Sequence, residues 1–230
     1  MTDIDTTREA LLDAALMHVP FDGWSETSFN SAARDAGLEL AEARAVCPRG
    51  ALDLAVAFHR RGDAAMMAHL AKADLQALKV RDRVTEAVRV RIEAINDKEA
   101  VRRGSALFAL PQNAVEGAQL IWGTADAIWT ALGDPSDDLN WYTKRAILSG
   151  VYSAVVLYWL GDESPGHQAT WAFLDRRIED VMRFENVKAQ MRSNPALKPF
   201  MAFPDWLASQ VKAPSRTPRV DLPGRWTAGR

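Results

Sequence analysis

The order of apolar and polar residues along the chain predicts helices almost throughout and gives little support for strands. Apolar residues recur every three or four positions, as in Val84, Val88 and Ile92, which places them on one face of a helix. Glycines and prolines separate the segments that follow this pattern. The predicted helices cover residues 6–17, 27–36, 40–46, 50–79, 81–96, 98–109, 112–132, 139–160 and 166–187, with a break near Gly62 left open. This pattern indicates an all-α protein.

The pattern changes near residue 190, where the chain becomes rich in proline and aromatic residues. We therefore divide it into a helix-turn-helix-like region (1–60), a helical region for lipid binding and dimerisation (61–190), and an amphipathic segment with a basic tail (191–230). The tail carries five basic residues and one acidic residue from Lys212 onward, a net charge of +4.

Residues 196–212 form the clearest amphipathic stretch. Its apolar side, with Trp206 near the edge, consists of Phe200, Phe203, Trp206, Leu207 and Val211. An apolar aromatic face beside a basic tail is typical of an interfacial membrane helix. Because Pro204 removes a helix hydrogen bond, the helix either kinks or begins there. The alternative is a terminal helix that docks on its own domain.

Charge and composition narrow the class of protein. The chain has 230 residues and a net charge of −2, which excludes a nucleic-acid-binding polycation. Residues 1–24 carry five acidic residues and one arginine, so neither a secretory signal nor a mitochondrial presequence is expected. The longest uncharged run, 146–161, is shorter than the roughly 20 residues of a membrane span. We expect a protein of the bacterial cytoplasm.

The first 60 residues resemble the helix-turn-helix unit of TetR-type regulators, with turns at Gly23 and Gly37. They contain ten acidic and five basic residues, a net charge of −5. A module that grips phosphates needs lysine and arginine instead. We predict a degenerate helix-turn-helix with no nucleic-acid partner; a ligand-responsive TetR-type transcriptional regulator is the alternative.

Motifs for catalysis are missing. The sequence has no G-x-G-x-x-G, P-loop, H-E-x-x-H or G-x-S-x-G motif. The histidines are scattered, and none forms a Glu-x-x-His pair of the kind that holds di-iron. They are His18, His59, His69 and His167. We expect no enzyme activity, no catalytic residue, no metal and no cofactor, and interpret the histidines as structural or surface residues.

One helical face combines a carboxylate with two indoles. Trp122, Asp126 and Trp129 share this face through their helical spacing. A charge there is costly unless it is paired, and Lys144 or Arg145 on the next helix is the expected partner. Two interpretations stay open: an internal ion pair, or a polar anchor for the head group of a bound lipid.

Small residues in the helix 139–160 allow another helix to approach closely. They form two small-x-x-x-small pairs, Ser149 with Ser153 and Gly150 with Ala154. Packing within one chain and packing across a dimer are both compatible with this spacing.

Four stretches of the chain are similar to the coenzyme Q biosynthesis accessory family, known as "Coq nine". They are HVPFDGW (18–24), ALPQN (109–113), DAIWTALGDPSDDLNWYTKRAILSGVYS (126–153) and DESPGHQATWAFLDRRIEDVM (162–182). The most specific part is the D-x-N-W-Y-T-[KR]-R core at 138–145. The chain is identified as a bacterial member of this family over about residues 8–187.

The resemblance implies a TetR-like fold that does not bind DNA, a homodimer formed through the last long helices, and an apolar cavity for an isoprenoid lipid or phospholipid. We expect this cavity between the helices 112–132, 139–160 and 166–187. It also implies peripheral docking on the inner membrane and presentation of demethoxyubiquinone to its di-iron hydroxylase. The predicted function is a non-enzymatic lipid-binding accessory factor in ubiquinone biosynthesis.

The family's partner surface maps onto Trp141, Tyr142 and Arg145, with Lys144 in place of the first arginine of the family motif. These residue types dominate protein-binding hot spots. Trp141 and Arg145 are i, i+4 neighbours on one helical face. We expect Trp141 to be exposed and to contact the hydroxylase. In the alternative, structural interpretation, Trp141 plugs the preceding turn and Arg145 neutralises Asp126.

Overall fold

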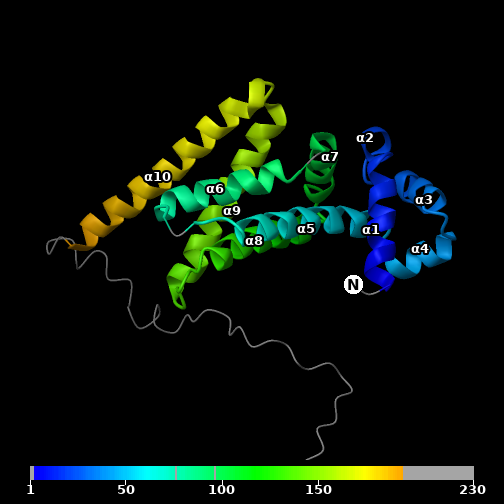
Figure 1. Cartoon of the computed structure of the whole chain (residues 1–230), viewed down its shortest axis with the longest axis horizontal. Coiled ribbons are helices and arrows are strands. Elements are labelled where there is room, and N and C mark those ends of the chain that lie inside the picture. The colour runs from blue at the N-terminus through cyan, green and yellow to red at the C-terminus, as the bar shows by residue number, and fades with distance from the viewer. Residues whose placement is uncertain (1–2, 76, 96, 194–230) are drawn as a thin grey trace, which may run out of the picture.

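The computed structural model describes residues 3–75, 77–95 and 97–193, which are helical and contain no strand (Figure 1). This confirms the all-α class. The helices are α1 (Asp3–Leu16), α2 (Val19–Asp22), α3 (Glu26–Asp35), α4 (Leu40–Val46), α5 (Ala51–Leu70), α6 (Val80–Glu93), α7 (Lys98–Phe108), α8 (Ala114–Ala131), α9 (Leu139–Gly161) and α10 (Gln168–Ser193), with a 3-10 turn at Pro165–His167.

The residues predicted to bind the membrane lie outside the described residues. They are Phe200, Phe203, Trp206, Leu207 and Val211. Helix α10 continues to Ser193, past the end at residue 187 that the sequence predicted. The predicted boundary at 190 therefore falls inside this helix.

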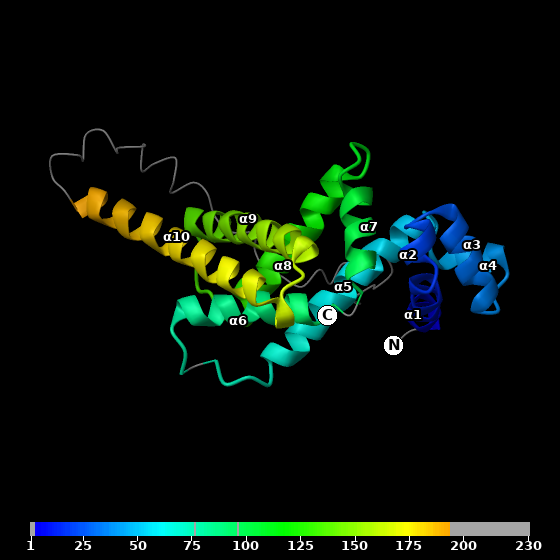
Figure 2. The same cartoon turned by 90° about the horizontal axis from the view of Figure 1, so that it is seen from above.

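The N-terminal unit packs α1, α3 and α4 against the first turns of α5 (Figures 1 and 2). Its core is separate from the rest and includes the fully buried side chains of Leu11, Phe29 and Leu54. The single cysteine, Cys47, is buried in this core, and burial raises the pKa of its thiol. The unit has the helix-turn-helix arrangement predicted from the sequence.

Local signals fix both ends of α3. Its cap is Ser25, whose side chain accepts a hydrogen bond from the backbone N–H of Ser28. At the other end Gly37 has a φ of +68°, and the N–H of Leu38 donates to the carbonyl of Ala33. These contacts satisfy backbone groups that a helix end leaves unpaired.

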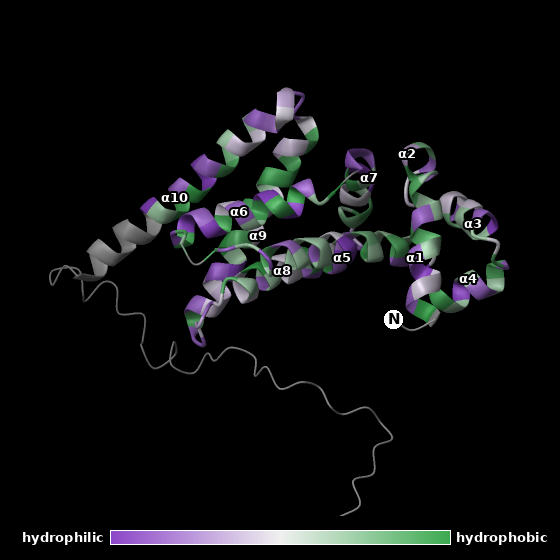
Figure 3. Cartoon of the chain, viewed as in Figure 1, coloured by the Kyte–Doolittle hydropathy of each residue, from purple (hydrophilic) through white to green (hydrophobic). Residues whose placement is uncertain are grey.

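A second core joins α6, α8, α9 and α10 to the C-terminal half of α5. The side chains of Met66, Val88, Ile128 and Leu174 are almost completely buried in it. Figure 3 shows apolar and hydrophilic residues alternating along most of these helices, as amphipathic packing requires. Helix α5 contributes residues to both cores. The predicted domain boundary at residue 60 falls within this continuous helix.

Helix α5 passes Gly62 without a break, and this glycine makes room for Arg91 of α6. A Cβ atom at Gly62 would lie 2.4 Å from Nη1 of Arg91. Arg91 is 1% exposed; its Nε donates to Oδ1 of Asp63 at 2.6 Å and its Nη2 to the carbonyl of His59 at 2.9 Å. The guanidinium group thus lies directly on the backbone of α5.

Replacing Gly62 by alanine should therefore lower the free energy of unfolding by about 1–3 kcal/mol, because the new methyl group displaces a buried, hydrogen-bonded guanidinium. Alanine alone would favour the helix by about 0.5–1 kcal/mol. Gly123→Ala on α8 is the control, since a Cβ there meets nothing within 4 Å among the described residues. Chemical denaturation should show destabilisation only for Gly62→Ala; equal effects would contradict the close approach.

Candidate ligand-binding cavity

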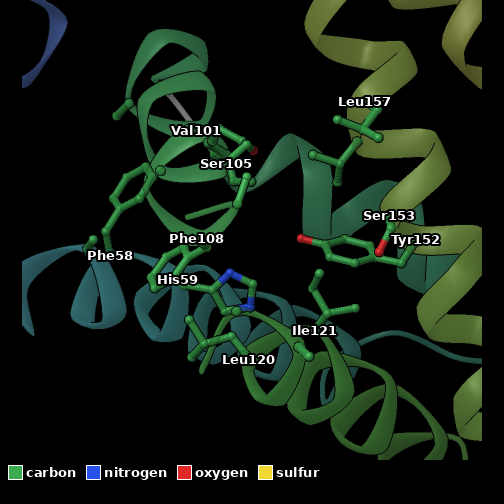
Figure 4. Close-up of a pocket in the computed structure, with 18 of the residues that line it drawn as sticks. Phe58, His59, Val101, Ser105, Phe108, Leu120, Ile121, Tyr152, Ser153 and Leu157 are labelled. Atoms are coloured by element: carbon green, nitrogen blue, oxygen red, sulfur yellow. The ribbon is translucent and has the colours of Figure 1, made fainter. Parts of the chain in front are cut away.

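A cavity of about 370 Å³ lies between α5, α7, α8 and α9 (Figure 4). The side chains labelled in Figure 4 are Phe58, His59, Val101, Ser105, Phe108, Leu120, Ile121, Tyr152, Ser153 and Leu157. Most of its wall is apolar, and its volume falls in the range of about 300–1,000 Å³ that is usual for small-molecule sites. This cavity differs in position from the one expected between the helices 112–132, 139–160 and 166–187, because α5 and α7 contribute to its wall and, among the described residues, α10 does not.

Helix α7 forms one wall and is held from both sides. Nε1 of Trp24 donates to the carbonyl of Ala100 at 3.0 Å, which ties α7 to the N-terminal unit. Nζ of Lys98 donates to the carbonyl of Asp162 at 2.7 Å, which ties it to the end of α9. A Cβ at Gly117 would lie 2.8 Å from Cβ of Phe108, so α7 also ends tightly against α8. These contacts fix the width of the cavity.

Behind the apolar wall runs a network of polar side chains. Nε2 of His59 and Oγ1 of Thr124 share a hydrogen bond of 2.9 Å. Oγ1 of Thr124 donates to Oδ1 of Asp63 at 2.8 Å, and Asp63 pairs with Arg91. The ring of Tyr152 on α9 lies 5.8 Å from the Arg91 guanidinium carbon. Four helices, α5, α6, α8 and α9, thus meet through one polar network at the cavity.

Two groups of this network are uncharged at neutral pH. Burial, with the nearby charge of Arg91, lowers the pKa of His59 to about 4. Burial also raises the pKa of the Tyr152 phenol, although Arg91 opposes the rise. The cavity therefore presents a neutral imidazole and a neutral phenol.

Because of His59, the free energy of unfolding should fall by on the order of 3 kcal/mol as the pH is lowered from 6.5 to 4. An unfolded histidine binds its proton near pH 6.5, whereas folded His59 does so only near pH 4. Within this window the unfolded chain binds more protons, so stability is complete above pH 6.5 and is lost as pH falls through 4. Urea unfolding across this range should show a shallower pH dependence for His59→Gln.

His69→Gln is the matched control, because His69 is exposed on the same helix. It should keep the wild-type pH dependence. A wild-type slope in His59→Gln would show that folded His59 titrates like an exposed histidine.

A second cavity, of about 230 Å³, lies between α6, α8, α9 and α10, and so includes the three helices that the sequence was expected to place around a cavity. Of the three candidate lipid-binding residues, only Trp129 lines it; Trp122 and Asp126 line neither cavity. Trp122 instead packs on Trp141, with ring centroids 6.0 Å apart. Asp126 accepts a hydrogen bond from Nε of Arg145 at 2.6 Å. The internal ion pair, one of the two open interpretations, is confirmed.

Trp141 and Arg145 are buried, with 9% and 0% exposure, so the prediction that Trp141 is exposed is wrong. The guanidinium carbon of Arg145 lies 3.9 Å from the Trp141 ring centroid. Its Nη1 also lies 3.2 Å from Oδ2 of Asp134, which is 1% exposed. Tyr142 is partly exposed and packs edge-on against Trp141 at 4.8 Å. We call these four residues with Asp126 the Arg145 cluster.

The cluster also stabilises the turn between α8 and α9. Burial opposes ionisation of Asp134, but hydrogen bonds from Lys144, Ser136 and Arg145 together lower its pKa. Nζ of Lys144 donates to Oδ1 of Asp134 at 2.7 Å. The structural interpretation therefore accounts for the positions of Trp141 and Arg145.

The N-terminal unit uses several of its arginines in internal ion pairs. Arg44 of α4 pairs with Glu26 of α3. Nη1 of Arg49 lies 2.8 Å from Glu116 of α8, and Arg49 also pairs with Asp53. Guanidinium groups that a DNA-binding module would direct at phosphates are thus directed at carboxylates.

The described residues also bear on two other features, a metal site and a membrane-spanning helix. These residues include no cluster of three or more His, Cys, Asp or Glu side chains that could hold a metal ion. In the same part of the chain, no helix is both long and apolar enough to cross a membrane.

Fold comparison defines the class. A TetR transcriptional regulator from Nitrosomonas europaea ATCC 19718 superimposes with a TM-score of 0.64 and 19% identity, covering 76% of this chain and 97% of the regulator. The protein has an all-helical, TetR-like fold with an apolar cavity lined by residues of both cores.

Sequence comparison shows which family of proteins the chain is similar to. Residues 114–185 match the family model described as COQ9. The chain is 32% identical over 194 residues to "Ubiquinone biosynthesis protein COQ9, mitochondrial" of Rattus norvegicus, covering 80% of this chain and 61% of the rat protein. The Homo sapiens protein of that name is 29% identical over 194 residues, covering 80% of this chain and 60% of the human protein. The chain carries this match to the COQ9 family model and is similar to these relatives, of whose length it spans about three fifths.

Sequence reasoning missed the polar residues at the cavity. The sequence predicts His59 to be a structural or surface residue and does not single out Arg91 or Tyr152. One signal was available: Arg91 interrupts the apolar spacing of α6, so a buried partner could have been expected. Gly62, inside a helix and next to Asp63, indicated where α6 could approach.

Proposed function

We propose that the chain is a non-enzymatic accessory factor in ubiquinone biosynthesis, which holds an isoprenoid or quinone intermediate in the cavity between α5, α7, α8 and α9 and presents it to a ring hydroxylase at the membrane. The observation that carries this proposal is the apolar cavity of about 370 Å³. The family relationship supplies the pathway, since the relatives are ubiquinone biosynthesis proteins.

The test is to extract purified protein with organic solvent and identify the released lipid by mass spectrometry. Wild-type protein should release an isoprenoid lipid in near-stoichiometric amount. Ser153→Phe should reduce the amount strongly, because it places a ring in the cavity wall. Ala65→Phe is the control, on the exposed part of α5. Release of no lipid, even after incubation with prenylated quinone precursors, would contradict the proposal.

Homodimerisation through the last long helices is part of the proposal. A Cβ at Gly150 would meet no described atom within 4 Å, so no described helix of the same chain occupies this part of the small-residue stripe. Leu157 on the same helix is 64% exposed. Light scattering at micromolar concentration should give about twice 25.4 kDa. A monomer mass at that concentration would contradict this geometry.

Peripheral membrane binding through residues 196–212 also remains a proposal, supported by their amphipathic pattern. Because α10 runs to Ser193, removal of residues 194–230 leaves the described helices whole. This truncation should abolish flotation with anionic vesicles. Unchanged flotation would place the membrane contact elsewhere.

A further inference from the structure

Large apolar side chains are exposed at the edge of the second cavity. Val80, at the start of α6, and Met182, on α10, both line this cavity and are 51% and 39% exposed. Leu78, two residues before Val80, is 39% exposed. Nε of Arg83 donates to the carbonyl of Leu78 at 2.9 Å, which holds the backbone before α6 against the helix. The apolar surface at the start of α6 is therefore both exposed and fixed in place.

Two basic side chains alternate with the apolar ones along this part of the chain. Lys79 and Arg81 are exposed, and neither has an ion-pair partner among residues 3–75, 77–95 and 97–193. Asp82 is the one carboxylate in residues 77–83, against three basic side chains. The sequence Leu78–Arg81 thus offers two apolar side chains and two uncompensated cations. We call these four residues the α6 rim.

Positive charge prevails only on the α6 side of the second cavity. On α10, Glu179 pairs with Arg183 at 2.7 Å and Asp180 with Arg177 at 2.8 Å. Across the cavity, the turn before α9 carries two exposed carboxylates, at residues 137 and 138. An anionic surface would therefore meet attractive charge at the α6 rim and not at the start of α9.

The α6 rim lies at the end of the protein to which the proposed membrane segment is attached. Figures 1 and 2 show the start of α6 and the C-terminal half of α10 at the same end, away from α1–α4. Helix α10 runs past the second cavity to Ser193, and residues 196–212 follow it in the chain. Both surfaces are thus connected through α10.

We propose that the α6 rim is a second membrane-contact surface, which binds anionic lipid head groups through Lys79 and Arg81 and places Leu78 and Val80 in the interface. Apolar side chains beside cations are typical of interfacial contacts, and each cation adds to the attraction of an anionic leaflet. A second contact on the same body forms at high effective concentration once the first has bound. This inference rests on the proposed peripheral membrane binding and adds a fixed orientation of the helical body on the membrane.

The experiment measures flotation of the full-length protein with phosphatidylcholine vesicles that contain about 30% phosphatidylserine. Lys79→Glu with Arg81→Glu should weaken vesicle binding at least about tenfold, because two attractive charges become repulsive. Arg34→Glu with Arg60→Glu is the matched control, since both arginines are exposed and the net charge changes equally. Charges more than about 8–10 Å from the surface are screened at physiological salt, so the control should lose less than about threefold.

A second pair of variants tests the apolar side chains. Leu78→Ser with Val80→Ser should weaken vesicle binding about threefold or more, because it removes apolar area from the interface. Leu110→Ser with Val115→Ser is the matched control, since these residues are of the same types and are 44% and 71% exposed. The control should bind vesicles as the wild type does.

The outcomes separate this inference from the proposed function. Equal losses in a variant and its control would overturn the α6 rim as a contact and leave membrane binding through residues 196–212 intact. A changed mass of Leu78→Ser with Val80→Ser in light scattering would also overturn it, because these side chains would then pack against a second copy of the chain. If the wild type does not float with the anionic vesicles, the proposed membrane binding itself fails.

Discussion

Replacement of Arg145 by methionine should lower the free energy of unfolding by about 3–5 kcal/mol, because it removes one partner of a buried ion pair. Arg145 is completely buried and faces Asp134, which is 1% exposed. Methionine fills a similar volume but leaves this carboxylate in the interior with Lys144 as its remaining cation. The measurement is equilibrium unfolding in urea.

Two further variants test the cause. Asp134→Asn in the Arg145→Met background should recover part of the loss, since it removes the uncompensated charge. Arg183→Met is the control: Arg183 also pairs with a carboxylate, but its side chain is 71% exposed. Such surface pairs contribute about 0–1 kcal/mol. Equal losses at Arg145 and Arg183 would show that the Arg145 cluster does not stabilise the fold.

Trp141→Ala should also destabilise the protein by about 3–5 kcal/mol, since it deletes a buried indole. The ring packs against Trp122 and under the guanidinium of Arg145. For a chain of this size the loss corresponds to a melting point lowered by about 10 °C or more. Trp141→Phe keeps a ring beneath Arg145 and should lose clearly less. A near-wild-type melting point for Trp141→Ala would mean that the indole is not part of the core in solution.

This expectation changes how the proposed partner surface should be tested. Loss of hydroxylase binding in Trp141→Ala would be ambiguous, because the cluster beneath the surface is disrupted as well. Tyr142 is partly exposed, so Tyr142→Ala is the sharper variant. A hot-spot residue costs about 2 kcal/mol or more of binding when removed. A pull-down should therefore lose the hydroxylase, while the melting point should fall clearly less than in Trp141→Ala.

The sequence determined the helices, the helix-turn-helix arrangement and the ion pair of Asp126. These depend on local information: apolar spacing shows which face of a helix is buried, and Gly37 marks the end of a helix. The partner of Asp126 was also within reach, since a carboxylate on an apolar face needs a cation on the neighbouring helix. Arg145 is that cation.

Only the tertiary structure decided which helices enclose the cavity and which residues become buried. Periodicity gives the buried face of each helix but not the helix that packs on it, so α7 could not be recognised as a cavity wall. His59 and Tyr152, from α5 and α9, line the same cavity, and beside them Gly62 lets Arg91 of α6 lie on α5. The sequence predicts Trp141 to be an exposed hot-spot residue, yet in the structure its ring packs against Trp122 and the guanidinium group of Arg145. Burial of a side chain depends on helices distant in sequence, and local pattern carries no information about their crossing.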